Sequence, residues 1–256
     1  MHPASWPSSV LITGASSGIG EALANAYAEA GASLALSGRS ERRLEAVAAA
    51  CRAKGATVNA AILDVQEKDS MQDWIQSVDE AAPLDLVIAN AGISGGTGGG
   101  GEPETQARAI FAINIDGMLN TLHPAIARMQ NRGQGQIALM SSLAGFRGFA
   151  GAPAYSAAKA AVRVYGEALR GALHDDGIGV SVICPGFVES RMTAVNKYKM
   201  PFLMSAEQAA TLIQRGLARN KARIAFPFPT YFMSWLMGSL PPALTDPIFR
   251  MLPKKE

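Results

Sequence analysis

Short apolar segments alternate with longer segments of helical character along most of the chain. Most of the apolar segments precede a helical stretch, such as the one predicted at residues 20–30 or the charged, alanine-rich one at 41–54. Continuous apolar strands separated by helices are typical of a parallel sheet that is covered on both faces. With right-handed crossovers, the pattern predicts an α/β fold with a doubly wound sheet. The predicted strands are residues 10–13, 33–37, 57–63, 84–90, 136–141, 180–184 and 223–226.

The chain has no internal repeat and no linker long enough to divide it, so we predict one domain over residues 1–256.

Two segments interrupt the alternation. Residues 92–101 include seven glycines, which predicts a mobile backbone there, and the tail after Phe226 is rich in aromatic residues, methionine and proline.

Composition narrows the functional classes. The net charge of +2 gives no case for nucleic acid binding, and 48% hydrophobic residues is ordinary for a soluble globule. Cys51 and Cys184 lie far apart, with no spacing that suggests a metal, which fits a reducing cytosol. Because the first strand begins by Val10, no room is left for a signal peptide, and we expect a cytoplasmic protein.

A glycine-rich turn, TGASSGIG at residues 13–20, lies between the first predicted strand and its helix. Such a turn lets the backbone approach a pyrophosphate, which the helix N-terminus then attracts; alone it is also compatible with an ordinary tight turn. Its position after a strand and before a helix favours nucleotide binding. The residues expected to contact the cofactor are Gly14, Ser16, Ser17, Gly18, Ile19 and Gly20.

The end of the second strand distinguishes between cofactors. Folds that prefer NAD usually place an acidic residue there for the ribose hydroxyl, whereas this chain has Gly38 followed by Arg39. An arginine can pair with a 2′-phosphate through two hydrogen bonds. The sequence therefore favours NADP(H), with NAD(H) and a merely solvated arginine as the alternatives.

The sequence YSAAK places Lys159 four residues after Tyr155 in a helical segment. Residues four apart are neighbours on a helix, and a nearby ammonium lowers the pKa of an acid by about 1–3 units. The phenol would then approach the range in which general acid–base catalysis is efficient. Alone, the pair is more typical of an ordinary helix surface, but Ser142 at a strand end and the glycine turn upstream favour catalysis.

Together these motifs closely resemble the classical short-chain dehydrogenase/reductases, from Val10 to Phe226. The resemblance rests on TGASSGIG, NAG at 90–92, Asn114, Ser142, YSAAK and PG at 185–186. It implies a Rossmann-type, seven-stranded parallel sheet in one domain, a nicotinamide cofactor and interconversion of an alcohol and a carbonyl. One departure is mild: Ser190 stands where the family often has threonine, and it keeps the hydroxyl.

The resemblance also implies roles for individual residues. Tyr155 is similar to the catalytic acid/base, Lys159 to its partner that also binds the nicotinamide ribose, and Ser142 to the serine that binds the carbonyl. Asn114 resembles the structural and proton-relay asparagine. For the cofactor, the resemblance implies Asp64 and Val65 at the adenine, Asn90, Ala91 and Gly92 on the adenosine side, and Pro185, Gly186 and Val188 at the nicotinamide.

Three segments are candidates for the substrate side. Phe146, Arg147 and Phe149 follow Ser142 and either wall the pocket or pack a loop. Residues 187–205 correspond to a mobile lid in the family, and their apolar side chains favour a partly hydrophobic substrate; an ordinary surface crossover is the alternative.

The apolar extension at 227–256 has three interpretations: a subunit interface, packing at the pocket, or contact with a membrane surface. The family commonly forms dimers or tetramers, so we expect a homo-oligomer. Tyr231, Phe232, Trp235 and Leu236 are predicted to share one apolar helix face. Lys254 and Lys255 leave the lipid interpretation open.

We therefore predict an NADP(H)-dependent carbonyl reductase or alcohol dehydrogenase acting on a small molecule. One alternative is a 3-oxoacyl-carrier-protein reductase, which PGFVES resembles. Against it, the chain runs about thirty residues beyond the last strand, and Asp175 and Asp176 suit an acidic carrier poorly. The other alternative is a regulator that senses NADP(H) without turnover, for which a broken Ser/Tyr/Lys set would be the sign; this set is intact.

Overall fold

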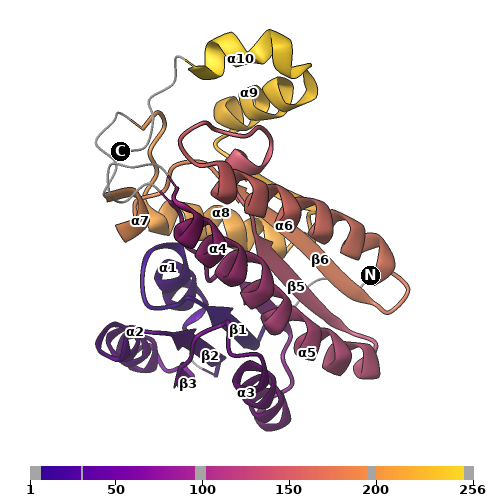
Figure 1. Cartoon of the computed structure of the whole chain (residues 1–256). Coiled ribbons are helices and arrows are strands. Elements are labelled where there is room, and N and C mark those ends of the chain that lie inside the picture. Colours follow the sequence, from indigo (N-terminus) through magenta and orange to yellow (C-terminus); the bar gives the residue numbers. More distant parts are fainter. Residues whose placement is uncertain (1–6, 30, 96–101, 195–199, 251–256) are drawn as a thin grey trace.

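The computed structural model describes residues 7–29, 31–95, 102–194 and 200–250, and its centre is a seven-stranded parallel sheet (Figure 1). The strand order is β3-β2-β1-β4-β5-β6-β7. The predicted doubly wound, Rossmann-type sheet is therefore confirmed. The strands are β1 (Ser9–Thr13), β2 (Ser33–Gly38), β3 (Thr57–Ile62), β4 (Leu86–Ala89), β5 (Gly135–Met140), β6 (Ile178–Pro185) and β7 (Arg223–Phe226).

Strand β1 lies in the middle of the sheet and pairs with both β2 and β4. The chain first winds outward from β1 to β3 and then returns to the other side of β1 at β4. The order of the strands reverses at this point, and a crevice opens there at the carboxyl ends of the strands. The reversal thus determines where the glycine turn after β1 meets the segments after β4 and β5.

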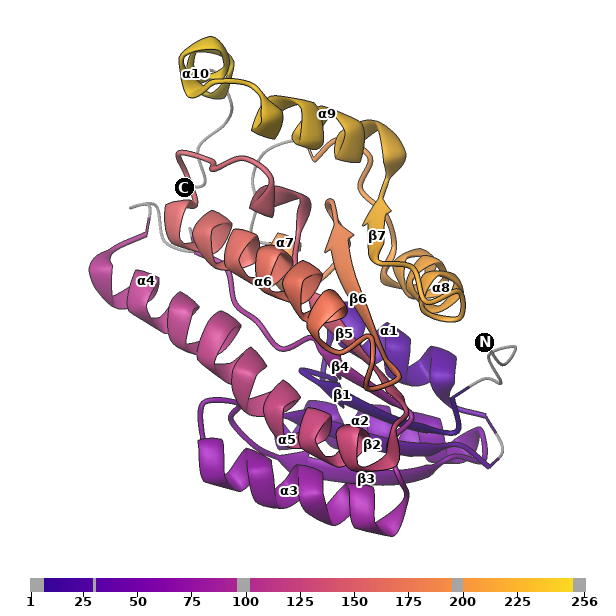
Figure 2. The ribbon, with the colours of Figure 1, turned by 90° about the vertical axis from the view of Figure 1, so that its right-hand side faces the viewer.

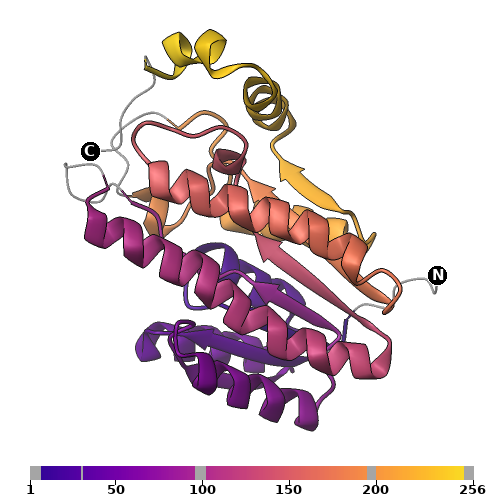
Figure 3. The same ribbon diagram turned by 45° about the vertical axis from the view of Figure 1, so that its right-hand side comes forward.

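Helices cover both faces of the sheet, because successive strand residues point to opposite sides. Val10 and Ile12 of β1 belong to the apolar core on one face of the sheet, whereas Leu11 belongs to the core on the other face. Figure 3 shows the helices on both sides of the sheet. The first layer contains α1 (Gly18–Tyr27), α2 (Glu41–Ala53) and α8 (Ala206–Leu217), and the second contains α3 (Lys68–Ala81), α5 (Gly117–Arg132) and α6 (Pro153–Ala172). Helix α4 (Glu104–Phe111) continues through the π-helical segment η1 (Ala112–Asp116) into α5.

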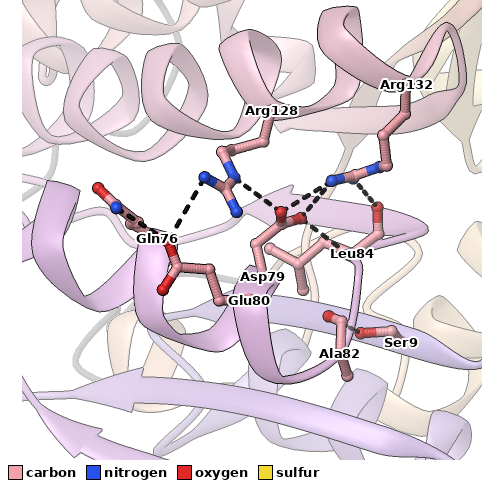
Figure 4. A network of polar contacts seen from close by, with 8 residues as sticks. All are labelled: Ser9, Gln76, Asp79, Glu80, Ala82, Leu84, Arg128 and Arg132. Atoms are coloured by element: carbon pink, nitrogen blue, oxygen red, sulfur yellow. Dashed lines mark hydrogen bonds and ion pairs between the residues drawn. The ribbon is translucent and has the colours of Figure 1, made fainter.

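A buried carboxylate joins α3, α5 and the segment before β4 (Figure 4). Asp79 is 3% exposed and accepts hydrogen bonds from Nε of Arg128 at 2.9 Å and from Nη1 of Arg132 at 2.8 Å. The backbone N–H of Leu84 donates to the same carboxylate at 3.0 Å. Burial alone raises the pKa of Asp79, but these donors outweigh it, so the pKa of the carboxyl is lowered.

The C-terminal extension forms two helices, α9 (Phe228–Ser239) and α10 (Pro242–Arg250). Figure 2 shows them beyond the end of the sheet toward which β6 and β7 point. Helix α9 packs against β7 and against η2 (Leu143–Gly145), the short turn that follows Ser142. Within the described ranges, no helix is long and apolar enough to cross a bilayer.

Candidate active site

A cavity of about 440 Å³ opens at the carboxyl ends of the strands. Of the residues that the sequence analysis assigns to catalysis or cofactor binding, all line this cavity except Asn114. They come from the turns after β1 to β6 and from α6, so segments that lie far apart in the chain meet on one concave surface. The lining also includes residues that the sequence analysis did not single out, among them Arg43, Ser141, Thr230 and Ser234.

The glycine turn after β1 lies tightly against the end of β4. Gly14 has a φ of 67°, and a Cβ atom at this position would come within 2.8 Å of Cα of Ala91. The side chain of Thr13 supports the contact, since its Oγ1 accepts from the backbone N–H groups of Asn90 and Ala91, each at 3.2 Å. Thr13 was not predicted as a site residue; its polar side chain at the end of an apolar strand was the available signal.

At the adenosine end of the cavity, Arg39 is mostly exposed, with 60% of its side chain accessible. Its Nη1 lies 3.5 Å from a carboxylate oxygen of Asp64, which also lines the cavity. Arg43, four residues later, lines the same end, and its Nε atom is buried without a hydrogen-bond partner among the described residues. The sequence analysis missed Arg43; its position in the first turn of α2, close after Arg39, was the available signal.

Ser142 lies just beyond the end of β5 and is 9% exposed. Its Oγ accepts from the backbone N–H of Ala144 at 3.1 Å and donates to the carbonyl of Pro185 at 3.4 Å. Both contacts hold the hydroxyl at the carboxyl end of the sheet, beside the cavity. The predicted serine is thus positioned by backbone groups from the ends of two neighbouring strands.

Tyr155 and Lys159 occupy the first two turns of α6 and face the cavity. The Nζ atom of Lys159 lies 5.7 Å from the centre of the Tyr155 ring and donates to the carbonyl of Met140 at 2.8 Å. At the start of the helix, Glu102 accepts hydrogen bonds from the backbone N–H groups of Ala154 at 2.5 Å and Tyr155 at 3.3 Å. This carboxylate fixes the first turn of α6, and no local sequence pattern indicated it.

The pKa values differ from the sequence expectation. Burial raises the pKa of the Tyr155 phenol, and a hydrogen bond with Ser142 is the smaller, opposing cause. Burial also lowers the pKa of Lys159 to about 8. The expected lowering of the tyrosine pKa by the neighbouring ammonium is therefore wrong for this structure, because desolvation dominates and the ammonium donates to a backbone carbonyl.

A second serine joins α6 to the end of β5. Ser141, which is 1% exposed, donates from Oγ to the carbonyl of Lys159 at 2.7 Å. The adjacent serines both line the cavity but have separate contacts: Ser141 binds α6, and Ser142 binds the end of β6. The sequence alone did not distinguish this role for Ser141.

Asn114 lies in the π-helical segment η1 and is 2% exposed. Its side-chain oxygen accepts from the N–H of Ile93 at 2.8 Å, and its Nδ2 donates to the carbonyl of Ile93 at 2.9 Å. The amide thus pairs with both backbone groups of one residue after β4. Asn114 also lies directly behind Gly92, where a Cβ atom would come within 3.0 Å of its oxygen.

The substrate side of the cavity is mainly apolar. Of the three candidates after Ser142, only Phe149 lines the cavity. Phe146 packs edge-on against Tyr231 of α9 at 5.6 Å, and Arg147 pairs with Asp246 of α10 at 2.7 Å. The other described lining residues on this side are Leu143, Ala144, Gly151, Ala152, Phe187, Met192, Thr193, Thr230 and Ser234.

The predicted lid begins beside the cavity with Phe187 and Val188 and includes α7 (Arg191–Ala194). An isolated bridge joins Val188 to Met204. The lid expected at 187–205 falls partly outside the described residues, at 195–199, as does the glycine-rich loop expected to be mobile, at 96–101.

His123 and His174 are not among the residues that line this cavity. Nε2 of His123 is 3.1 Å from the hydroxyl of Tyr165, and His174 pairs with Asp175 at the surface. Across residues 7–29, 31–95, 102–194 and 200–250, no group of three or more His, Cys, Asp and Glu side chains is arranged to hold a metal.

Comparisons with known proteins agree with this arrangement. The model of the short chain dehydrogenase family matches residues 8–200. An uncharacterized oxidoreductase of Myxococcus xanthus is 40% identical over 243 residues, which are 94% of this chain and 96% of the relative.

Two solved structures share the fold. A short-chain dehydrogenase from Sphingobium yanoikuyae, in complex with NADPH, has a TM-score of 0.79 and 23% identity, with 97% of each chain covered. A short chain dehydrogenase from Mycobacterium paratuberculosis, bound to NAD, has a TM-score of 0.75 and 24% identity, with 85% of this chain and 94% of that one covered.

The chain belongs to the short-chain dehydrogenase family, as its motifs indicated. It is accordingly an oxidoreductase of the short-chain class.

Proposed function

We propose that the protein interconverts a carbonyl and a secondary alcohol with NADP(H), and that Tyr155 is the acid/base. The observation that carries the proposal is the meeting of Ser142, Tyr155 and Lys159 with the glycine turn on the wall of one cavity. In this proposal residues 1–256 form one catalytic domain, with a lid at 187–205 and a C-terminal extension from residue 227.

The residues present fit a nicotinamide dinucleotide. The turn that ends at the start of α1 offers backbone N–H groups, and the missing side chain of Gly14 lets this turn lie against the end of β4. Arg39 and Arg43 supply guanidinium groups at the end where a 2′-phosphate would lie. When bound, the nicotinamide supplies or accepts the hydride.

The chain's own residues handle the proton. In reduction, the phenol of Tyr155 donates its proton to the carbonyl oxygen, and in oxidation it takes the proton back. The Ser142 hydroxyl donates a hydrogen bond to the same oxygen and holds it beside the phenol. Lys159, whose ammonium is buried next to the tyrosine ring, binds the ribose hydroxyls and stabilises the phenolate once the proton has left.

Replacing Tyr155 by phenylalanine tests the proton donor. We expect Tyr155→Phe to bind NADPH as tightly as the wild type but to lose about 10²–10⁴-fold in kcat for carbonyl reduction, because only the hydroxyl is removed. The measurement is NADPH absorbance with a panel of aldehydes and ketones. Tyr165→Phe is the matched control, since Tyr165 lies on the same helix but bonds His123 instead of lining the cavity.

Wild-type rates in Tyr155→Phe would contradict the assignment of the acid/base. If the wild type binds NADPH but does not oxidise it with any carbonyl of the panel, the result would instead favour a regulator that senses NADP(H) without turnover. High activity confined to acyl-carrier substrates would favour the 3-oxoacyl-carrier-protein reductase.

Cofactor preference is tested at the two arginines. We expect Arg39→Ala and Arg43→Ala each to raise the dissociation constant of NADPH by roughly 10-fold or more. The dissociation constant of NADH should change by less than about 2-fold, because only NADPH carries the 2′-phosphate. Arg42→Ala is the control, since Arg42 is exposed on α2 and is absent from the cavity lining. Titration by fluorescence of the reduced cofactor gives both dissociation constants, and equal losses for the two cofactors would refute a phosphate-reading role.

A further inference from the structure

Thr230, in the first turns of α9, is among the residues that line the cavity. Its hydroxyl oxygen is buried, and no hydrogen-bond partner for it exists in the described part of the chain. A buried hydroxyl without a partner costs free energy relative to one in water, and a polar group that enters the cavity would recover this cost by bonding it.

Ser234 lies one helical turn after Thr230 and lines the same cavity. Residues four apart share one side of a helix, so the two hydroxyls form a short polar strip along α9. The helix, FPTYFMSWLMGS, contains no charged residue. The strip is therefore suited to a neutral hydrogen-bonding group. It also lies beyond residue 200, where the match to the family model ends.

Contacts on the inner side of α9 hold this strip in place. The hydroxyl of Tyr231 accepts from Nη1 of Arg223 at 3.1 Å, and its ring packs on Phe146. At Gly238, the last residue but one of the helix, the backbone lies so close to Phe146 that a Cβ atom would collide with its carbonyl oxygen. The helix is thus fixed against the loop that connects Ser142 to the catalytic helix.

Helix α10 secures the same loop from its other end. Arg147 donates to Asp246 at 2.7 Å and to the hydroxyl of Thr245 at 3.2 Å, and its guanidinium lies over the ring of Phe249. Phe249 also packs against Phe149, which lines the cavity. The two extension helices and the loop after Ser142 therefore form one packed unit above the reaction site.

We propose that Thr230 and Ser234 form a second polar subsite for the substrate. The substrate would carry a neutral hydroxyl, carbonyl or amide group apart from the reacting carbonyl, on an otherwise apolar body. The apolar lining by Leu143, Phe149 and Phe187 accommodates that body. The inference rests on the proposed function, because it assumes that the reacting carbonyl lies at Ser142 and Tyr155.

A hydroxyl scan tests the subsite. The probes are 2-decanone and its derivatives with one hydroxyl group at each carbon from C5 to C10. We expect at least one hydroxylated ketone to be reduced with a kcat/KM roughly 5- to 100-fold above that of 2-decanone, the advantage expected when a buried polar group gains its partner. Thr230→Val, which keeps the shape and removes the hydroxyl, is expected to abolish this advantage, so that the hydroxylated ketone and 2-decanone have the same kcat/KM when both are measured with this variant.

Ser234→Ala should reduce the same advantage, whereas Ser239→Ala is the matched control. Ser239 lies on the same helix, but its hydroxyl is exposed and donates to the carbonyl of Trp235. Hydroxylated ketones that gain nothing over 2-decanone, or a gain that Thr230→Val retains, would overturn the proposal.

A binding measurement separates this inference from the proposed reaction. Calorimetric titration of each ketone into the Tyr155→Phe protein with NADPH gives affinities without turnover. If the wild type reduces none of the probes, the proposed function fails for them. A lower dissociation constant for a hydroxylated ketone than for 2-decanone, lost in Thr230→Val, would still support the subsite. Equal dissociation constants for all the ketones would contradict it.

Discussion

At the scale of single residues, Lys159 is the buried charge on which the candidate site depends. The side chain is 4% exposed, and burial lowers its pKa to about 8. Its ammonium donates to Met140 at the end of β5 while its own carbonyl accepts from Ser141. The residue that we expect to stabilise the tyrosinate therefore also joins α6 to the sheet.

The lowered pKa of Lys159 has a consequence for stability. The folded pKa of about 8 lies below the ordinary value of 10.5, so between these values the unfolded chain binds more protons than the folded one. The free energy of unfolding should then rise with pH in this window. Below pH 8 the folded protein carries the full penalty for burying the charge, and this penalty is relieved as Lys159 loses its proton.

We expect the free energy of unfolding of the wild type, measured relative to Lys159→Met, to increase from pH 8 to 9.5 by up to about 1.4 kcal/mol per pH unit. Urea unfolding of both proteins at several pH values in this range is the measurement. Lys68→Met, at an exposed position at the start of α3, is the control and should leave the pH dependence as in the wild type. A constant difference between wild type and Lys159→Met would show that the lysine is not buried as described.

At the scale of elements, the Asp79 cluster connects α3 to α5 and to the chain entering β4. Nη2 of Arg132 also donates to the carbonyl of Leu84 at 3.1 Å, so one guanidinium contacts both the carboxylate and the backbone (Figure 4). The cluster lies at the end of the sheet away from the active site, since Leu84 precedes β4 and Asn90 follows it. We therefore expect it to affect stability and not catalysis.

Asp79→Asn should lower the free energy of unfolding by about 2–4 kcal/mol, because two guanidinium groups lose their buried counter-charge. Urea unfolding at pH 7 measures the loss, and NADPH binding should be unchanged. Glu80→Gln is the neighbouring control: Glu80 is 55% exposed, and its oxygen is 3.5 Å from Arg128, so a change under about 0.5 kcal/mol is expected. Equal losses of unfolding free energy in the two variants would show that the buried carboxylate contributes no more to stability than the exposed one.

At the scale of the whole molecule, the outer side of the C-terminal extension is apolar and accessible. Phe232 and Trp235 of α9 are 46% and 45% exposed, and their rings lie 6.1 Å apart. Tyr231 does not share this face as predicted; it points inward to Arg223 and Phe146. Packing at the pocket thus accounts for the inner side of α9, and the outer side is the part for which a subunit contact remains our prediction. Lys254 and Lys255, on which the membrane alternative partly rested, lie outside the described residues.

We expect the wild type to form a multiple of the 26.8 kDa chain in solution, and Phe232→Gln/Trp235→Gln to shift it toward the single chain, because polar side chains weaken an apolar contact. Light scattering after gel filtration gives the mass. Leu212→Gln, a change to an exposed apolar residue of α8, is the control. An unchanged mass, together with lost sedimentation on anionic phosphatidylglycerol vesicles, would favour the membrane interpretation.

The sequence by itself determined the features that depend on local spacing. Apolar runs predicted all seven strands to within a few residues. The inner strands were readable because a strand buried on both faces has to be apolar throughout, whereas the edge strand β3 is only partly buried. The glycine turn after β1 and the four-residue spacing of Tyr155 and Lys159 were also readable, since both depend on neighbouring residues in one element. The family followed from the combination of these motifs.

Only the tertiary structure decided what depends on packing between distant segments. Thr13 meets Asn90, Glu102 meets the start of α6 and Ser141 meets Lys159, although these partners are separated by 18 to 77 positions in the chain. The same holds for Thr230, which lines the cavity only because α9 packs against η2, the turn after Ser142. The direction of the Tyr155 pKa shift changed for this reason too: spacing places an ammonium nearby, but burial is a property of the assembled fold and has the larger effect.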